Sequence, residues 1–161
     1  VERPRREISV NNNNPPGSAD LCSIPGNGLK PGFDIGLSSA YPDLAPAAVG
    51  PYSQAIAANG FVFTSGQVPI DPKAGKIVAT TIEEQTEQVM KNLQCVLAQG
   101  GVSFDRVVKT TCFLSDINDF AAFNGVYAKY FPEGAPARSC VEVAALPLGA
   151  KVEVEVVAVQ G

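Results

Sequence analysis

The sequence predicts an α+β fold in which one sheet is covered by helices on a single face. From Ala47 onward, stretches with apolar residues at alternate positions are interleaved with stretches in which apolar residues recur every three or four positions. The first period is that of a half-buried strand and the second that of an amphipathic helix. The predicted order is strand, strand, short strand, helix, strand, helix, strand, strand, as a sheet covered by helices on one side requires.

The first two predicted strands form a hairpin. Residues Tyr52–Ala58 and Phe61–Ser65 are joined by Asn59-Gly60, the dipeptide that best satisfies the two left-handed positions of a tight turn. Residues 71–75 read Asp-Pro-Lys-Ala-Gly, which is turn chemistry. We therefore expect a third, short strand at Lys76–Val78.

The first helix is predicted over Ile82–Gln99. Thr81 and Glu84 have the spacing of a capping box at its start, and Gly100-Gly101 ends it. Its apolar face, at spacings of three and four, consists of Ile82, Thr86, Val89, Met90, Leu93, Val96 and Leu97.

The rest of the chain supplies three strands and a second helix. The strands are predicted at Arg106–Leu114, Arg138–Val143 and Val152–Val159, and the helix from Asp116 or Ile117 to about Phe131, where Pro132 and Gly134 stop it. In the first of these strands one face carries Val108, Thr110, Cys112 and Leu114. The buried stripe expected on the helix consists of Ile117, Phe120, Tyr127 and Phe131.

Residues 1–46 differ in character from the rest. They contain four consecutive asparagines and several Pro-Gly pairs with little periodic apolar content, so we expect a flexible N-terminal extension without regular structure. Its arginines favour the remnant of an organelle-targeting leader, whereas Glu2 and Glu7 among them count against one. The domain organisation predicted is an extension at 1–46 and one folded domain at 47–161, in a plastid or mitochondrion, with the cytoplasm as the alternative.

Composition excludes several classes of function. The chain has no histidine, which removes Ser-His and Cys-His nucleophile pairs, imidazole bases and most zinc sites. A net charge of −4 argues against a phosphate-neutralising surface, so no nucleic-acid partner is expected. No apolar run approaches the ~20 residues that span a bilayer, so no membrane partner is expected. Charged residues make up only 17% of the chain, which favours burial of surface between subunits.

The four cysteines are scattered along the chain. Cys22, Cys95, Cys112 and Cys140 form no Cys-x-x-Cys pair, and a chain of this length does not need a disulfide to fold. We therefore expect reduced thiols.

Three polar residues stand at positions where burial is expected, and each has two interpretations. Arg138 opens a strand flanked by Pro136 and Cys140, so it is either an edge charge or a packed carboxylate-binding group. Asn124 falls on or beside the apolar stripe of the second helix, as a loop-bonded amide or a site residue. Glu153 lies on the face of the last strand that carries both charged residues and valines, and it is either a salt-bridged surface residue or a catalytic carboxylate.

Five segments together resemble the Rid family of reactive intermediate deaminases, the YjgF type, in order and spacing. They are Gly50–Ala55, Thr64–Pro69, Asn124–Tyr127, Pro136–Val143 and Lys151–Glu155. The resemblance covers about Ala47 to Gly161. It implies a chorismate-mutase-like fold, a single mixed sheet with two helices packed on one face, assembled as a homotrimer with clefts between neighbouring subunits.

The resemblance also implies a reaction and its residues. Archetypal members of the family hydrolyse 2-aminoacrylate, 2-iminopropanoate and 2-iminobutanoate to 2-oxo acids and ammonia. By resemblance, Arg138 binds the substrate carboxylate and Glu153 holds the attacking water. Further site residues implied are Tyr52, Ser65, Gly66, Asn124 and Cys140. A protonated imine is already a strong electrophile, so positioning suffices and neither a metal nor a cofactor is expected.

Other interpretations stay open at this stage. The same cleft in a regulatory protein would sense a 2-oxo acid or an amino acid without catalysis. A ribonuclease, an activity ascribed to some relatives, fits poorly with an acidic chain that lacks histidine. Cys140 invites a nucleophile role, but without an imidazole partner packing is favoured. The sequence does not rank the three-carbon against the four-carbon imine.

Overall fold

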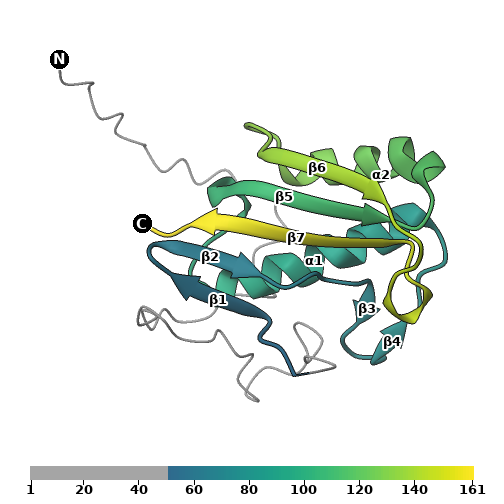
Figure 1. Cartoon of the computed structure of the whole chain (residues 1–161), viewed down its shortest axis with the longest axis horizontal. Coiled ribbons are helices and arrows are strands. Elements are labelled where there is room, and N and C mark those ends of the chain that lie inside the picture. The colour runs from purple at the N-terminus through teal and green to yellow at the C-terminus, as the bar shows by residue number, and fades with distance from the viewer. Residues whose placement is uncertain (1–50) are drawn as a thin grey trace, which may run out of the picture.

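The computed structural model describes residues 51–161, which form a five-stranded mixed sheet with two helices on one face (Figure 1). The strand order is β1-β2-β7-β5-β6, in which only β5 and β6 are parallel. The sheet consists of β1 (Ala55–Ala58), β2 (Phe61–Thr64), β5 (Val107–Leu114), β6 (Ala137–Glu142) and β7 (Val152–Val159). The helices are α1 (Ile82–Gln99) and α2 (Phe120–Tyr127). A separate small ladder pairs β3 (Ile70–Asp71) with β4 (Lys76–Ile77). The predicted fold class is confirmed.

Helix α1 has the predicted boundaries and the predicted cap. The Thr81 hydroxyl accepts a hydrogen bond from the Glu84 N–H at 3.2 Å, and the Glu84 carboxylate accepts one from the Thr81 N–H at 3.3 Å. The apolar face packs on the sheet, with Val89 and Leu93 fully buried. The sequence signal was strong here because capping and periodicity agree.

The second helix is shorter than predicted, because 3₁₀ turns replace both of its ends. Ile117–Asp119 and Ala128–Tyr130 are 3₁₀ turns on either side of α2. A 3₁₀ turn has three residues per turn, so the phase of the apolar stripe changes at the junction. As a result Ile117 and Phe120 are 45% and 36% exposed, contrary to the expected stripe, and Phe123 is buried instead.

The strand predictions needed small corrections. Strand β1 begins at Ala55, three residues later than expected, and the short β3 was not predicted. In β5 the register shifts between Val107 and Lys109, so Val108 is exposed rather than sharing the buried face. A bulge of this kind adds a residue and reverses the alternation on one side of it.

The two faces of the sheet have different surroundings. The face toward α1 and α2 is the core, to which β7 contributes Val152, Val154 and Val156, all at most 2% exposed. The opposite face, called here the open face, has no layer over it within residues 51–161 (Figure 1). Its exposed apolar side chains are Ile56, Phe61, Phe63 and Val141. An apolar surface of this kind favours contact with another protein surface.

Other expectations can be compared with the described residues. Cys112 and Cys140 are free thiols, whereas Cys95 is disulfide-bonded, so the expectation of reduced thiols is wrong for Cys95. Neither α1 nor α2 is long and apolar enough to cross a membrane. The predicted extension at 1–46 lies outside the residues that the structure describes.

Candidate active site

Arg138 is held against α2 rather than extended into solvent. Its Nη1 donates a hydrogen bond of 2.7 Å to Oδ1 of Asn124. The guanidinium carbon also lies 4.8 Å from the ring centre of Tyr127, 5.4 Å from that of Phe120 and 5.7 Å from that of Phe123. Such cation–π contacts stabilise the charged group without occupying its N–H donors. Most of the guanidinium fork therefore stays available for a ligand.

Local geometry explains why these side chains meet. Strand β6 runs parallel to β5 with Arg138 opposite Thr110, and Thr110 is fully buried on the helix face. Arg138 therefore points toward α2. On that helix, positions 120, 123, 124 and 127 have the spacing i, i+3, i+4, i+7, which places them on one face. The Asn124 amide oxygen therefore bonds the arginine and not a nearby loop, and its role as a site residue stays a prediction.

Cys140 lies two residues beyond Arg138 on the same face of β6, opposite Cys112. Burial raises the pKa of the Cys140 thiol, and the charge of Arg138 opposes that shift only in part. Burial raises the pKa of Cys112 to about 12. Both thiols are therefore protonated near neutral pH, which agrees with packing rather than a nucleophile role.

Glu153 belongs to a second group, on the open face. Its side chain lies over Gly66, where a methyl group added to the glycine would be only 2.8 Å from Cδ of Glu153. Burial raises the pKa of Glu153 above 4.5, and the nearby Glu155 carboxylate raises it further. A carboxyl with a raised pKa can exchange protons closer to neutral pH.

The segments on either side of Gly66 are fixed by hydrogen bonds. The Ser65 hydroxyl donates to the main-chain oxygen of Ser53 at 2.6 Å, and the Ser65 N–H donates to that of Gln54. Gln67 pairs with Val154 in β7 through two main-chain bonds. These bonds bring the segment that carries Tyr52 beside Gly66 and Glu153. Tyr52 is 44% exposed and precedes β1 instead of lying within it.

One subunit does not bring the two groups together. Glu153 pairs with Phe113 on the open face, whereas Arg138 pairs with Thr110 on the helix face. Side chains of adjacent residues in a strand alternate between faces, and these two belong to opposite sets. We call Arg138, Asn124 and Cys140 the arginine half-site of the candidate site, and Tyr52, Ser65, Gly66 and Glu153 the glutamate half-site.

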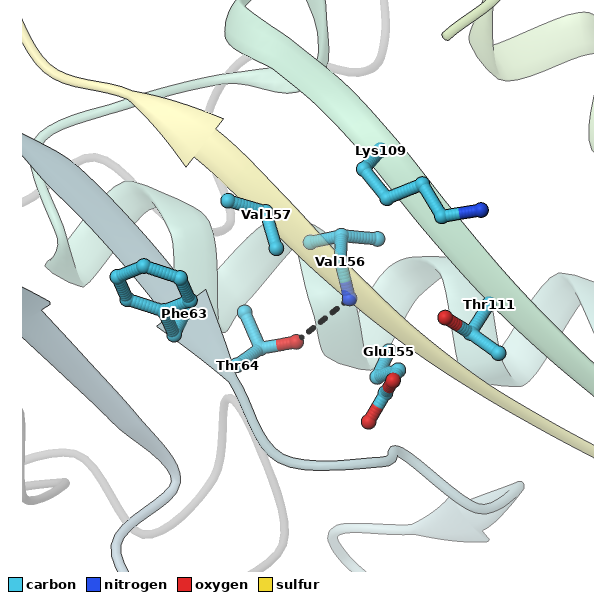
Figure 2. Close-up of a pocket in the computed structure, with 7 residues that line it drawn as sticks. All are labelled: Phe63, Thr64, Lys109, Thr111, Glu155, Val156 and Val157. Carbon is cyan, nitrogen blue, oxygen red and sulfur yellow. Dashed lines mark hydrogen bonds between the residues drawn. The ribbon is translucent and has the colours of Figure 1, made fainter. Parts of the chain in front are cut away.

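The open face also has a hollow of about 250 Å³ between β2, β7 and β5, which Figure 2 shows. Lys109, Thr111 and Glu155 bring polar groups to it, and Phe63 and Val157 form apolar walls. The Lys109 ammonium donates to the Ser139 hydroxyl at 2.8 Å. None of the residues that line this hollow belongs to either half-site.

Sequence reasoning missed the aromatic partners of Arg138. Phe120 and Tyr127 were expected to face the core, but their contact with the arginine was not foreseen. The signal was present in the helical spacing of these rings with Asn124. Among residues 51–161, no cluster of three or more His, Cys, Asp or Glu side chains could hold a metal ion.

A single mixed sheet with two helices on one face is the α+β fold that this chain shares with the solved structure of the YjgF gene product of E. coli, 40% identical, with a TM-score of 0.70 over 74% of this chain and 95% of that one. The family model described as endoribonuclease L-PSP matches residues 43–160. The chain belongs to this family, the Rid or YjgF family.

Relatives of this chain carry different names. "Reactive Intermediate Deaminase A, chloroplastic" of Arabidopsis thaliana is 54% identical over 114 residues, which cover 71% of this chain and 61% of that protein. The "2-iminobutanoate/2-iminopropanoate deaminase" of Mus musculus is 48% identical, over 73% of this chain and 87% of that protein. A Lactococcus lactis protein that carries the name "Putative regulator AldR" is 52% identical, over 71% of this chain and 90% of that protein.

The solved structures agree with the fold. A Rid-family protein from Yersinia pestis, 52% identical, superimposes with a TM-score of 0.71 over 73% of this chain and 94% of that one. At this identity the likeness extends to the sequence as well as to the fold.

Proposed function

We propose that this protein hydrolyses the reactive products 2-aminoacrylate, 2-iminopropanoate and 2-iminobutanoate to the 2-oxo acids and ammonia. The observation that carries the proposal is the state of Arg138, which is anchored by Asn124 and three rings while its fork remains available. A guanidinium held in this way fits the two oxygens of a small carboxylate. Deaminase names among relatives near 50% identity support the same conclusion.

The chemistry assigns one role to each half-site. Arg138 binds the substrate carboxylate and so fixes the imine carbon. Glu153, when ionised, accepts a proton from a water molecule as the water oxygen attacks that carbon. The resulting carbinolamine receives that proton on nitrogen. As its C–N bond breaks and ammonia leaves, the carbonyl forms and the hydroxyl proton passes to Glu153. Main-chain groups of Gly66 and Cys140 hydrogen-bond the substrate or the water, and Tyr52, Ser65 and Asn124 complete the rim.

In this proposal, assembly of several copies of the chain brings the two half-sites together. Because Arg138 and Glu153 lie on opposite faces of one sheet, the proposal requires the arginine half-site of one copy to meet the glutamate half-site of another. The exposed apolar side chains of the open face support burial against such copies. We take the assembly to be a homotrimer with three equivalent clefts, as the family resemblance implies.

The first experiment tests the reaction directly. A serine or threonine dehydratase is supplied with its amino acid, the purified protein is added, and the lifetime of the transient enamine and imine is followed. The proposal expects faster disappearance in proportion to protein concentration. Folded, trimeric protein that gives no acceleration at any concentration would contradict it and favour the sensor.

The assembly is tested by mixing two inactive variants. Arg138→Ala and Glu153→Gln each lack one half-site, and subunit exchange between them restores clefts that contain both native residues. Recovered activity in the mixture supports a site built from two copies. Two inactive variants that exchange subunits and stay inactive would contradict it.

One relative is named as a putative regulator, which favours sensing of a ligand as the second candidate function. In that function the cleft binds a 2-oxo acid or amino acid, and no imine is consumed. The dehydratase assay separates the two, because a sensor binds the ligand without shortening the life of the imine.

We also propose an organelle, a plastid in particular, as the compartment. The composition of residues 1–46 and the chloroplastic relative support this proposal. A fluorescent protein fused behind residues 1–46 should enter the organelle in plant cells. Uniform cytoplasmic fluorescence would argue for the cytoplasm.

A further inference from the structure

Tyr127 touches both the core and the proposed substrate-binding arginine. Its hydroxyl shares a hydrogen bond of 2.8 Å with the Thr110 hydroxyl, and its ring is the nearest of the three to the Arg138 guanidinium. We propose that Tyr127 is a positioning residue for Arg138, and that the Thr110–Tyr127 pair sets how tightly the site binds a carboxylate. The inference rests on the proposed function, in which Arg138 binds that carboxylate.

The location of the tyrosine ring is fixed from several sides. Tyr127 is 5% exposed and Thr110 is fully buried, so their hydrogen bond is shielded from water. The rings of Phe123 and Phe131 lie 5.4 Å and 4.8 Å from the Tyr127 ring. Burial raises the pKa of the Tyr127 hydroxyl, which keeps the hydroxyl protonated. The ring is therefore a rigid surface.

The register of the sheet places the arginine on that surface. Thr110 and Arg138 are direct partners on β5 and β6, and both point toward α2. Tyr127 thus bonds Thr110 through its hydroxyl and contacts Arg138 through its ring face. Asn124, one helical turn earlier, bonds Nη1 and sets the rotation of the guanidinium.

This arrangement matters for carboxylate binding because bidentate recognition is sensitive to angle. A guanidinium that binds two oxygens at once must present a fixed plane. A ring face attracts the cation and limits its tilt without competing for an N–H. Removing the ring frees the guanidinium to tilt, so affinity for the carboxylate falls while the water-activating half-site is unchanged.

The experiment measures binding of 2-oxobutanoate, the product of the proposed reaction, by calorimetry. Tyr127→Leu removes the ring and should bind about tenfold more weakly, whereas Tyr127→Phe keeps the ring and should lose less. Thr110→Val, a near isostere, releases the hydroxyl and serves if the leucine variant does not fold. In the dehydratase assay KM should rise while kcat changes little.

The matched control is Tyr130→Phe. The Tyr130 hydroxyl donates to the Glu87 carboxylate at 2.9 Å, its ring meets that of Phe104 edge-on, and it is not among the three rings that contact Arg138. This variant should bind 2-oxobutanoate like the unmodified protein. The uncharged 2-oxobutanamide is the second control, because positioning of Arg138 affects only the carboxylate.

The outcomes separate the two proposals. If Arg138→Ala binds 2-oxobutanoate as tightly as the unmodified protein, the proposed function is wrong. If Arg138→Ala loses binding while folded Tyr127→Leu and Thr110→Val both keep it, the inference alone is wrong. Equal weakening of 2-oxobutanoate and 2-oxobutanamide by Tyr127→Leu would also overturn it, because that pattern indicates general loosening of the site.

Discussion

Replacing Gly66 by alanine should slow the proposed reaction without unfolding the protein. The new methyl carbon would lie 2.8 Å from Cδ and 3.0 Å from Cγ of Glu153 and would overlap its Oε1. Carbon atoms in contact prefer about 3.5–4.0 Å, so the carboxylate must retreat by about 1 Å. A misplacement of about 1 Å can cost on the order of 100-fold in rate. We therefore expect kcat to fall about 100-fold.

The fold should tolerate the same change. Gly66 does not have a positive φ, so its backbone accommodates alanine, and the group that must move is the end of a flexible side chain. Replacing glycine at a compatible position stabilises by about 0.4–1 kcal/mol through the unfolded state, which offsets the displacement of Glu153. Tm should change by only a few degrees.

The assay is imine hydrolysis coupled to a dehydratase, with Tm measured on the same preparations. KM should change little because Arg138 is not touched. Gly125→Ala is the control, since Gly125 is exposed on α2 with no atom near the added methyl group, and it should keep full activity. Full kcat in Gly66→Ala would refute the role of Glu153, and a collapse of both Tm and activity would show that Gly66 is needed for folding instead.

Four further predictions concern charge and thiol chemistry. The acid limb of the kcat profile should lie above pH 4.5, because burial and Glu155 raise the pKa of Glu153, and it should move to lower pH in Glu155→Gln. The folded state binds the Glu153 proton more tightly than the unfolded state, so the free energy of unfolding falls as pH rises above 4.5. Glu153→Gln should therefore raise Tm more at neutral pH than at pH 4.5. An equal rise in Tm at both pH values would contradict the raised pKa of Glu153. Cys140→Ser should keep most activity while Arg138→Lys loses it, and equal loss in both would restore the nucleophile reading. Iodoacetamide, followed by peptide mass spectrometry, should label Cys140 well before Cys112, whose pKa is raised to about 12; labelling in the reverse order would show that Cys112 is accessible.

Local signals predicted the elements that are decided locally. The boundaries of α1 follow from a capping box, a 3.6-residue period and a terminal glycine pair, all within one stretch of chain. The Asn59-Gly60 turn follows from two residues that tolerate positive φ, and both have it. The start of β5 and the start of α2 were less predictable, because a bulge and a 3₁₀ turn depend on how strands and helices pack.

The candidate site divides in the same way. The sequence identified Arg138, Asn124 and Glu153 as polar residues at positions of burial, and it excluded imidazole chemistry because histidine is absent. The side chains that contact these three residues could not be predicted from the sequence. The rings that hold Arg138 reach it only because β6 pairs in parallel with β5 beside α2.

By itself, the sequence determined the fold class, the two periodicities and the residue types available for chemistry, because these depend on spacing along the chain. Only the tertiary structure decided which face of the sheet each side chain occupies. Arg138 and Glu153 fall on opposite faces because strand alternation and register are set jointly by neighbouring strands. That separation, which no local pattern encodes, is the physical reason for placing the proposed site between two copies of the chain.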